Sequence, residues 1–89
     1  MTTERILFSG QVQGVGFRYS VRILARRHPV QGFVRNLTDG TVELVAQGSS
    51  AAINALLADV QESFRSHIRR FDRETTTTNE TFEGFEIRF

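Results

Sequence analysis

The sequence of 89 residues predicts an α+β fold in which two helices cover one face of a mainly antiparallel sheet. Two observations support this prediction. Two segments carry apolar residues at helical spacing, and the other apolar runs are short and alternate as strands do. In chain order these elements read β-α-β-β-α-β, followed by one additional C-terminal strand. This order is typical of the ferredoxin-like sandwich, which is built from a split pair of βαβ units.

The first strand and the first helix are separated by a glycine-rich loop. Residues 5–10, RILFSG, predict a strand with Ile6 and Phe8 on one face. A helix is expected from Phe17 to about Arg27, and Pro29 ends it because the residue before a proline avoids helical geometry. The apolar face of this helix consists of Phe17, Val21, Leu24 and Ala25.

A hairpin is expected next in the chain. Residues 31–37 and 41–47 flank the turn TDGT, and Asp-Gly between two strand-like runs is a strong hairpin signal. The inward face of the second of these strands is formed by Val42, Leu44 and Ala46.

The second helix begins after a pair of serines, either of which, Ser49 or Ser50, is a suitable cap. The apolar face of this second helix consists of Ile53, Leu56, Leu57, Val60 and Phe64.

A less regular strand follows at residues 67–74, where Ile68 and Phe71 lie three positions apart and indicate a bulge or an edge strand.

The last strand is expected within residues 81–89, TFEGFEIRF. Phe85, Ile87 and Phe89 alternate there with Glu86 and Arg88, as residues on the two faces of a strand do.

Length and composition exclude several classes of protein. We expect a single domain over residues 1–89, with 39% hydrophobic and 24% charged residues as in ordinary globular proteins. The absence of cysteine excludes disulfides, iron–sulfur clusters, thiolate zinc sites and cysteine nucleophiles. The N-terminal apolar run is too short for a signal peptide or a membrane span, so a cytoplasmic protein is expected.

The charges are unevenly distributed along the chain. Residues 5–38 hold six arginines and no acid, whereas residues 39–89 hold nine acids and five arginines. The resulting positive field in the N-terminal half suits a small anionic ligand. The overall net charge of +1 argues against a nucleic-acid partner, which usually needs a broad basic surface.

The loop in GQVQGVGFR (residues 10–18) is a candidate anion site. A glycine-rich turn that leads into a helix directs several unpaired N–H groups toward one point, as phosphate cradles do. The alternative is that Gly14 and Gly16 only shape a tight turn, and the spacing alone leaves both open. The loop lacks the third glycine of a dinucleotide fingerprint and the Gly-Lys-Ser/Thr of a nucleotide P-loop.

Arg18 favours the anion site. The partial positive charge of a helix N-terminus repels a guanidinium unless an anion lies between them. With that anion present, the guanidinium and the backbone N–H groups all point at the same oxygens. Arg22 and Arg26 follow at i+4 spacing and are best explained as a solvated helix face, with electrostatic steering as the lesser alternative.

Asn36 is the second candidate residue, because asparagine is a poor strand former near the end of a strand. Two explanations stay open. Its side chain bonds the local backbone ahead of the turn, or its amide donates and accepts at once and so holds a water molecule. His28 and His67 lack acids at metal-ligand spacing and are expected at the surface or at helix ends, so the sequence gives no support for a metal site.

Four blocks stand out in this chain: GQVQGVGFR (10–18), GFVRN (32–36), DGTVE (39–43) and GFEIRF (84–89). They resemble the acylphosphatases, and the resemblance extends from Gly10 to Phe89. It implies hydrolysis of acyl phosphates to carboxylate and inorganic phosphate by a single acylphosphatase-like domain, without metal or cofactor. We expect inorganic phosphate, the product, to act as a competitive inhibitor. The charge and the apolar runs predict no nucleic-acid or membrane partner, and nothing in the sequence suggests more than a monomer.

The same resemblance implies roles for individual residues. Arg18 and the loop backbone would bind the phosphoryl group, and Asn36 would orient the attacking water. The phosphate-binding residues implied in this way are Gly14, Val15, Gly16, Phe17 and Arg18.

The chain departs from the family pattern at three places, none of which involves Arg18 or Asn36. His28-Pro29 replaces a glycine after the first helix, Ser20 replaces a bulkier residue, and the fourth strand is more highly charged. The main alternative is a non-catalytic binding module for acyl or carbamoyl phosphate, such as the acylphosphatase-like domain of larger hydrogenase-maturation or carbamoyl-transfer proteins. The lack of cysteine and of further domains favours the free-standing enzyme. A third hypothesis, a ferredoxin-like protein-interaction domain, predicts no phosphate affinity.

Overall fold

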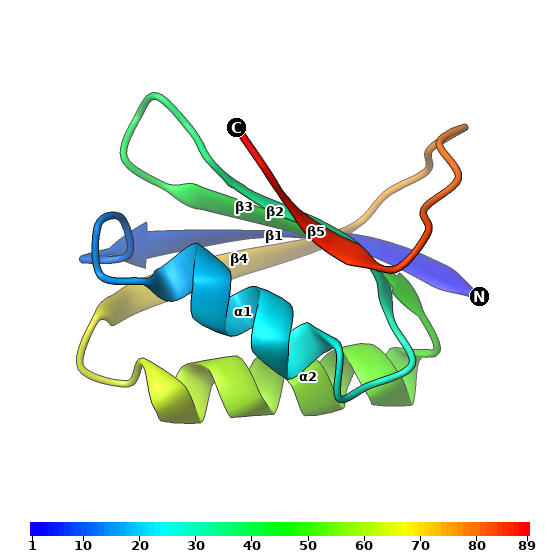
Figure 1. Cartoon of the computed structure of the whole chain (residues 1–89), viewed down its shortest axis with the longest axis horizontal. Coiled ribbons are helices and arrows are strands. Elements are labelled where there is room, and N and C mark those ends of the chain that lie inside the picture. The colour runs from blue at the N-terminus through cyan, green and yellow to red at the C-terminus, as the bar shows by residue number, and fades with distance from the viewer.

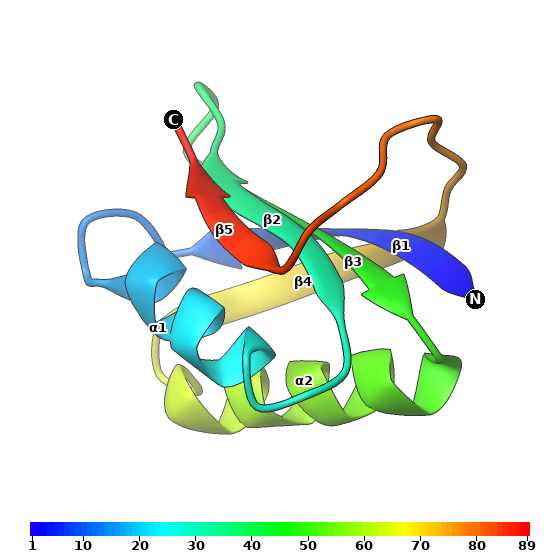
Figure 2. The ribbon, with the colours of Figure 1, turned by 45° about the vertical axis from the view of Figure 1, so that its right-hand side comes forward.

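Both helices cover the same face of a five-stranded sheet in the computed structural model, which describes all 89 residues (Figures 1 and 2). The strand order is β4-β1-β3-β2-β5. Only β2 and β5 pair in parallel, so the sheet is mainly antiparallel as predicted. The elements are β1 Thr2–Gly10, α1 Phe17–Ala25, β2 Gln31–Asn36, β3 Val42–Gly48, α2 Ser50–Ser63, β4 Ile68–Thr75 and β5 Phe85–Arg88.

The core lies between the sheet and the helices. Leu44 in β3 is opposite Ile6 in β1 on one side and Val34 in β2 on the other, and all three are completely buried. The predicted inward row of β3, Val42, Leu44 and Ala46, is likewise fully buried. Because side chains alternate along a strand, this register directs every second residue of the central strands toward the helices.

Aromatic rings join the start of α1 to the rest of the core. Phe17 packs edge-to-face against Phe8 of β1, at 5.2 Å between ring centroids, and against Phe64 at the end of α2, at 4.9 Å. Such edge-to-face pairs stabilise beyond the area that they bury. The first residue of α1 is therefore fixed firmly, which matters for the loop before it.

Helix α1 ends at Ala25, two residues before the predicted end near Arg27. The N–H groups of Arg27 and His28 donate to the carbonyls three residues earlier, Leu24 and Ala25, at 3.0 and 3.1 Å. Bonds of this spacing tighten the last turn ahead of Pro29, so the chain leaves the α-helical path early.

Strand β4 is both an edge strand and bulged, which confirms the two features that its irregular pattern indicated. It pairs only with β1, and the register shifts where Ser9 is opposite Arg70 and Gly10 is opposite Ile68. Gly10 adopts a φ of +123°, and a Cβ there would lie 2.4 Å from the carbonyl oxygen of His67. The chain needs glycine at this point.

A smaller apolar cluster covers part of the opposite face of the sheet. Phe82, in the segment between β4 and β5, buries Phe33 of β2 and Val45 of β3, and the guanidinium of Arg88 lies 3.9 Å from the Phe33 ring centroid. Strand β5 ends at Arg88, so Phe89 lies beyond the strand and is exposed. Neither α1 nor α2 is long and apolar enough to span a membrane.

Candidate functional site

The loop between β1 and α1 presents a cluster of backbone donors. Gly14 and Gly16 both adopt a φ of +77°, a conformation that favours glycine, and Gly16 is the N-cap of α1. The first intrahelical bond runs from the Ser20 N–H to the Gly16 carbonyl at 3.0 Å. The N–H groups from Gly14 to Tyr19 donate to no acceptor within the protein. Donors concentrated in this way at a helix N-terminus suit an anion.

Helix α2 differs from α1 in that a side chain caps its N-terminus. Its N-cap, Ser49, accepts a hydrogen bond from the Ala52 N–H at 3.1 Å, so a side chain of the protein satisfies the start of α2. At α1 no side chain caps the helix, and its first turn holds no acid. Of the two helices, α1 is therefore the one that leaves its N-terminal donors and its dipole for a ligand.

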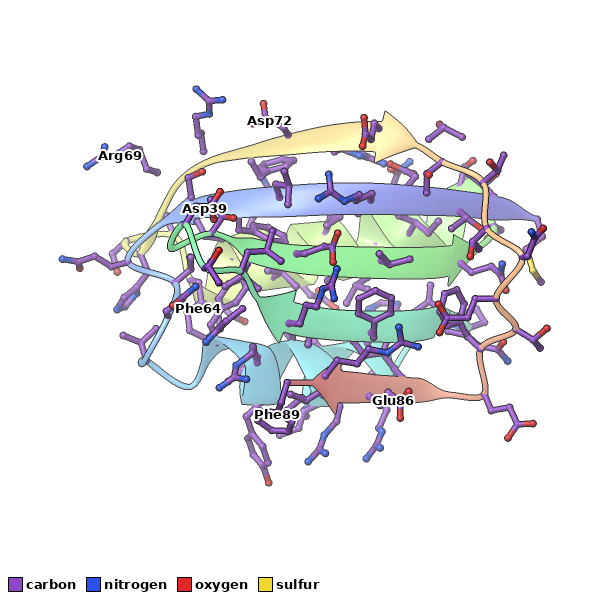
Figure 3. All side chains as sticks on the ribbon, turned by 90° about the horizontal axis from the view of Figure 1, so that it is seen from above. Asp39, Phe64, Arg69, Asp72, Glu86 and Phe89 are labelled. Atoms are coloured by element: carbon purple, nitrogen blue, oxygen red, sulfur yellow. The ribbon has the colours of Figure 1, made fainter.

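Arg18 lies in the first turn of α1 and forms no ion pair with a carboxylate. Its guanidinium carbon is 5.1 Å from the centroid of the Phe89 ring, and Figure 3 shows that ring beside α1. A cation–π contact of this kind leaves the guanidinium charged, so Arg18 can still pair with an anion. The other arginines of α1 and of the following turn are also free of ion pairs: Arg22, Arg26 and Arg27.

A cavity of about 130 Å³ brings the loop backbone and Arg18 together. Its polar side is formed by the glycines of the loop and by Arg18. Its apolar side comes from the start of α1 and the end of the chain. The complete lining is Val12, Gly14, Gly16, Phe17, Arg18, Tyr19, Ile87 and Phe89. The cavity therefore offers hydrogen-bond donors and a positive charge for an anion, next to apolar walls.

Asn36 is the last residue of β2 and does not line this cavity. It lies opposite Val42 in the ladder, and by alternation with Val34 it faces the helices. Its Oδ1 atom is buried and accepts no hydrogen bond from the protein. Buried acceptors of this kind almost always have a partner, and a bound water is the usual one when the protein supplies none.

The turn after Asn36 is held by another residue. The carboxylate of Asp39 accepts hydrogen bonds from the Thr41 hydroxyl at 2.6 Å and from the Thr41 N–H at 3.0 Å. These bonds hold the pKa of the Asp39 carboxyl below its ordinary value. Asn36 makes no such bond, so the local-turn explanation of this residue finds no support in its contacts.

Gln13 is a site residue that sequence reasoning missed. Its Nε2 atom donates to the carbonyl oxygens of Leu37 and Thr41, each at 2.9 Å, and so joins the loop to the β2–β3 hairpin. The loop and this hairpin lie at the same end of the sheet in Figures 1 and 2. The acceptors are 24 and 28 residues away along the chain, so no local spacing announces them. The only signal in the sequence is the place of Gln13 within the glycine-rich loop.

The histidines belong to other parts of the structure. His28 is paired with an acid from far along the chain, because its Nε2 lies 2.6 Å from a carboxylate oxygen of Asp59. His67 packs against the ring of Phe64 at 5.8 Å. No group of three or more histidine, cysteine, aspartate or glutamate side chains is arranged to hold a metal ion.

Comparisons with known proteins agree on one family. A family model described as Acylphosphatase matches residues 4–87. An acylphosphatase of Bifidobacterium longum is 44% identical over 92 residues, which cover 99% of this chain and 93% of the relative. The crystal structure of acylphosphatase from Bacillus subtilis matches with a TM-score of 0.90 and 33% identity, over 100% of both chains. HypF of T. kodakarensis matches all of this chain with a TM-score of 0.88 and 28% identity, but only 12% of its own length.

Proposed function

The chain belongs to the acylphosphatase family and hydrolyses acyl phosphates to carboxylate and inorganic phosphate, and we propose that the α1 N-terminus and Asn36 are the parts that carry this reaction. In this proposal the phosphoryl group binds to Arg18 and to the backbone N–H groups of residues 14–18. Asn36 orients the water that attacks phosphorus. The observation that carries the proposal is the uncapped start of α1, where free N–H groups meet an unpaired arginine.

The phosphoryl group has the charge and shape that this site requires. Its oxygens are negatively charged, and they would supply the anionic partner that neither the α1 dipole nor Arg18 has within the protein. In a loose, metaphosphate-like transition state the charge spreads over the equatorial oxygens, where N–H donors and a guanidinium can stabilise it. The donors are fixed before the substrate arrives, since Phe17 at their centre is packed against Phe8 and Phe64.

The remaining chemistry requires little of the protein. A carboxylate leaves readily from phosphorus, so no strong general acid is needed to protonate the leaving group. What remains is to hold the attacking water in line with the bond that breaks. The unpartnered Oδ1 of Asn36 supports this role, because it is an acceptor for one proton of a water molecule.

The alternative of a non-catalytic phosphate-binding module is not favoured. The relatives that match this chain over nearly their whole length are acylphosphatases. We further propose that inorganic phosphate, the product, competes with the substrate at Arg18. The monomeric state, the location in the cytoplasm and the independence from metal stay predictions from the sequence.

The function is tested by comparing two substrates in the presence of a chelator. We expect acetyl phosphate to be hydrolysed equally fast with and without the chelator. An alkyl phosphate monoester should react at least about 100-fold more slowly, because its alkoxide leaving group needs the general acid that this site lacks. Activity that the chelator abolishes and a divalent cation restores would contradict the proposal, and so would equal rates for the two substrates.

A further inference from the structure

Gln13 forms the only side-chain hydrogen bonds that leave the loop between β1 and α1. At the base of this loop the Gln11 N–H donates to the His67 carbonyl, and at its end Ser20 bonds back to Gly16 within α1. Between these points the chain passes through Gly14 and Gly16, the residue type with the greatest backbone freedom. The two bonds from the Gln13 amide therefore hold the loop against the β2–β3 hairpin.

The two acceptors of Gln13 belong to the residue pair next to Asn36 in the sheet, on the side of the hairpin turn. The first, the Leu37 carbonyl, belongs to the residue after Asn36. The second, the Thr41 carbonyl, belongs to the residue before Val42, which is opposite Asn36 in the ladder. Thr41 also accepts the Leu37 N–H at 2.9 Å, so the amide of Gln13 joins the pair of residues that closes the hairpin.

From these contacts we infer that Gln13 is a positioning residue that sets the distance between the phosphoryl-binding loop and Asn36. The inference rests on the proposed function, in which the loop holds phosphorus and Asn36 holds the water. An in-line displacement needs the water oxygen and the phosphorus aligned with the bond that breaks. A displacement of either atom by about 1 Å can lower the rate by about 100-fold. Gln13 is the polar link between the elements that hold them.

The chemistry of a glutamine fits this position. Its NH2 group supplies two donors for two carbonyl oxygens, and it adds no charge beside an anion site. Glutamate has the same shape but would place an acceptor against two acceptors and a negative charge near the bound phosphate. Methionine has similar length without donors. Gln11 provides a matched control, because it is a glutamine of the same loop whose exposed side chain forms no hydrogen bond.

The test measures kcat for acetyl phosphate and the inhibition constant of inorganic phosphate, for the full chain and its variants. Gln13→Ala and Gln13→Met should lower kcat by about 10- to 100-fold and weaken phosphate inhibition by less than about 3-fold. Gln13→Glu should lower kcat at least as much. Gln11→Ala should stay within about 2-fold of the parent in both. Thermal melts followed by circular dichroism verify that each variant is folded at the assay temperature.

A double-mutant cycle separates positioning from a general loss of structure. Once Asn36→Ala has removed the group that holds the water, the further change Gln13→Met should lower kcat by less than about 3-fold, because the two residues act on one step. A kcat penalty for Gln13→Met that is as large with Asn36→Ala as without it would overturn the inference, and so would a parent-like kcat of Gln13→Met. Absence of hydrolysis by the parent chain would instead contradict the proposed function itself.

Discussion

At the scale of single residues, Glu43 shows how this fold accommodates a buried charge. Its carboxylate lies on the face of the sheet away from the helices, and it accepts hydrogen bonds from Arg5 and from Arg35. Burial by itself would raise the pKa of Glu43, but the two guanidinium groups outweigh it and hold the pKa below its ordinary value. The pKa of Arg5 is raised in turn by its hydrogen bond to Glu43. The charge is stable here because it is paired on both sides.

The lowered pKa of Glu43 gives stability a predictable dependence on pH. A carboxyl with a lower pKa in the folded state stabilises the fold above its unfolded value, 4.5, and loses that contribution as the pH falls through the folded value. Glu43→Gln should lower the free energy of unfolding at pH 7 by about 1–3 kcal/mol. It should also reduce the loss of stability between about pH 6 and pH 3.

Urea unfolding of both proteins at pH 7 and at pH 3 measures these effects. The difference between parent and variant should be smaller at pH 3. An equal difference at the two pH values would show that the charge of Glu43 does not stabilise the fold.

At the scale of elements, the two helices begin in opposite ways. Ser49 caps α2 with its own side chain, whereas α1 begins at Gly16 with free donors and with Arg18 in its first turn. Local rules of helix stability favour the first arrangement and oppose the second. Places where a sequence breaks a local rule without repair inside the protein are expected at functional sites. The contrast therefore supports the assignment of the site to α1.

This contrast predicts that stability and activity separate at the two helix starts. Ser49→Ala should lower the free energy of unfolding by about 1 kcal/mol, because the Ala52 N–H loses its acceptor. It should leave kcat/KM for an acyl phosphate unchanged, since α2 forms no part of the cavity. Urea unfolding and steady-state kinetics measure both quantities, with the neighbouring Ser50→Ala as the control. A loss of activity in a Ser49→Ala variant that is fully folded under the assay conditions would show that α2 takes part in the site.

At the scale of the whole molecule, charge is divided between a paired sheet and an unpaired helix. Most arginines of the strands bond to carboxylates, as Arg5, Arg35 and Arg73 do. The arginines of α1, Arg18 and Arg22, have no such partners, so their positive charge is not neutralised within the protein. Unscreened charge close to a binding site attracts anions from solution.

The sequence predicted the order of the elements because its local signals are strong and agree with one another. Asp39-Gly40 marked the hairpin, and the alternation of Val42, Leu44 and Ala46 marked the central strand. Phe89 shows the limit of such patterns. It continues the alternation of β5 in the sequence, yet the strand ends one residue earlier and the Phe89 side chain is exposed.

The site was predictable to different degrees for different residues. Arg18 was found because it conflicts with the helix dipole, a conflict that is visible in the sequence alone. Asn36 stayed open between two explanations, because only the three-dimensional structure shows that its Oδ1 is buried without a partner. Gln13 could not be found, since its function depends on carbonyls that the fold brings close from far along the chain.

The central claim is that Arg18 and Asn36 act on different parts of the reaction, and one comparison tests it most directly. Turnover of an acyl phosphate and inhibition by inorganic phosphate are measured for the parent, Arg18→Ala and Asn36→Ala. Arg18→Ala removes a charge-assisted hydrogen bond worth about 1.5–3 kcal/mol, so both turnover and phosphate affinity should fall by at least about 10-fold. Asn36→Ala should lose most of its turnover with phosphate inhibition within about 2-fold of the parent. If Asn36→Ala weakens phosphate inhibition as much as Arg18→Ala does, then Asn36 binds phosphate or shapes the loop, and the division of roles is wrong.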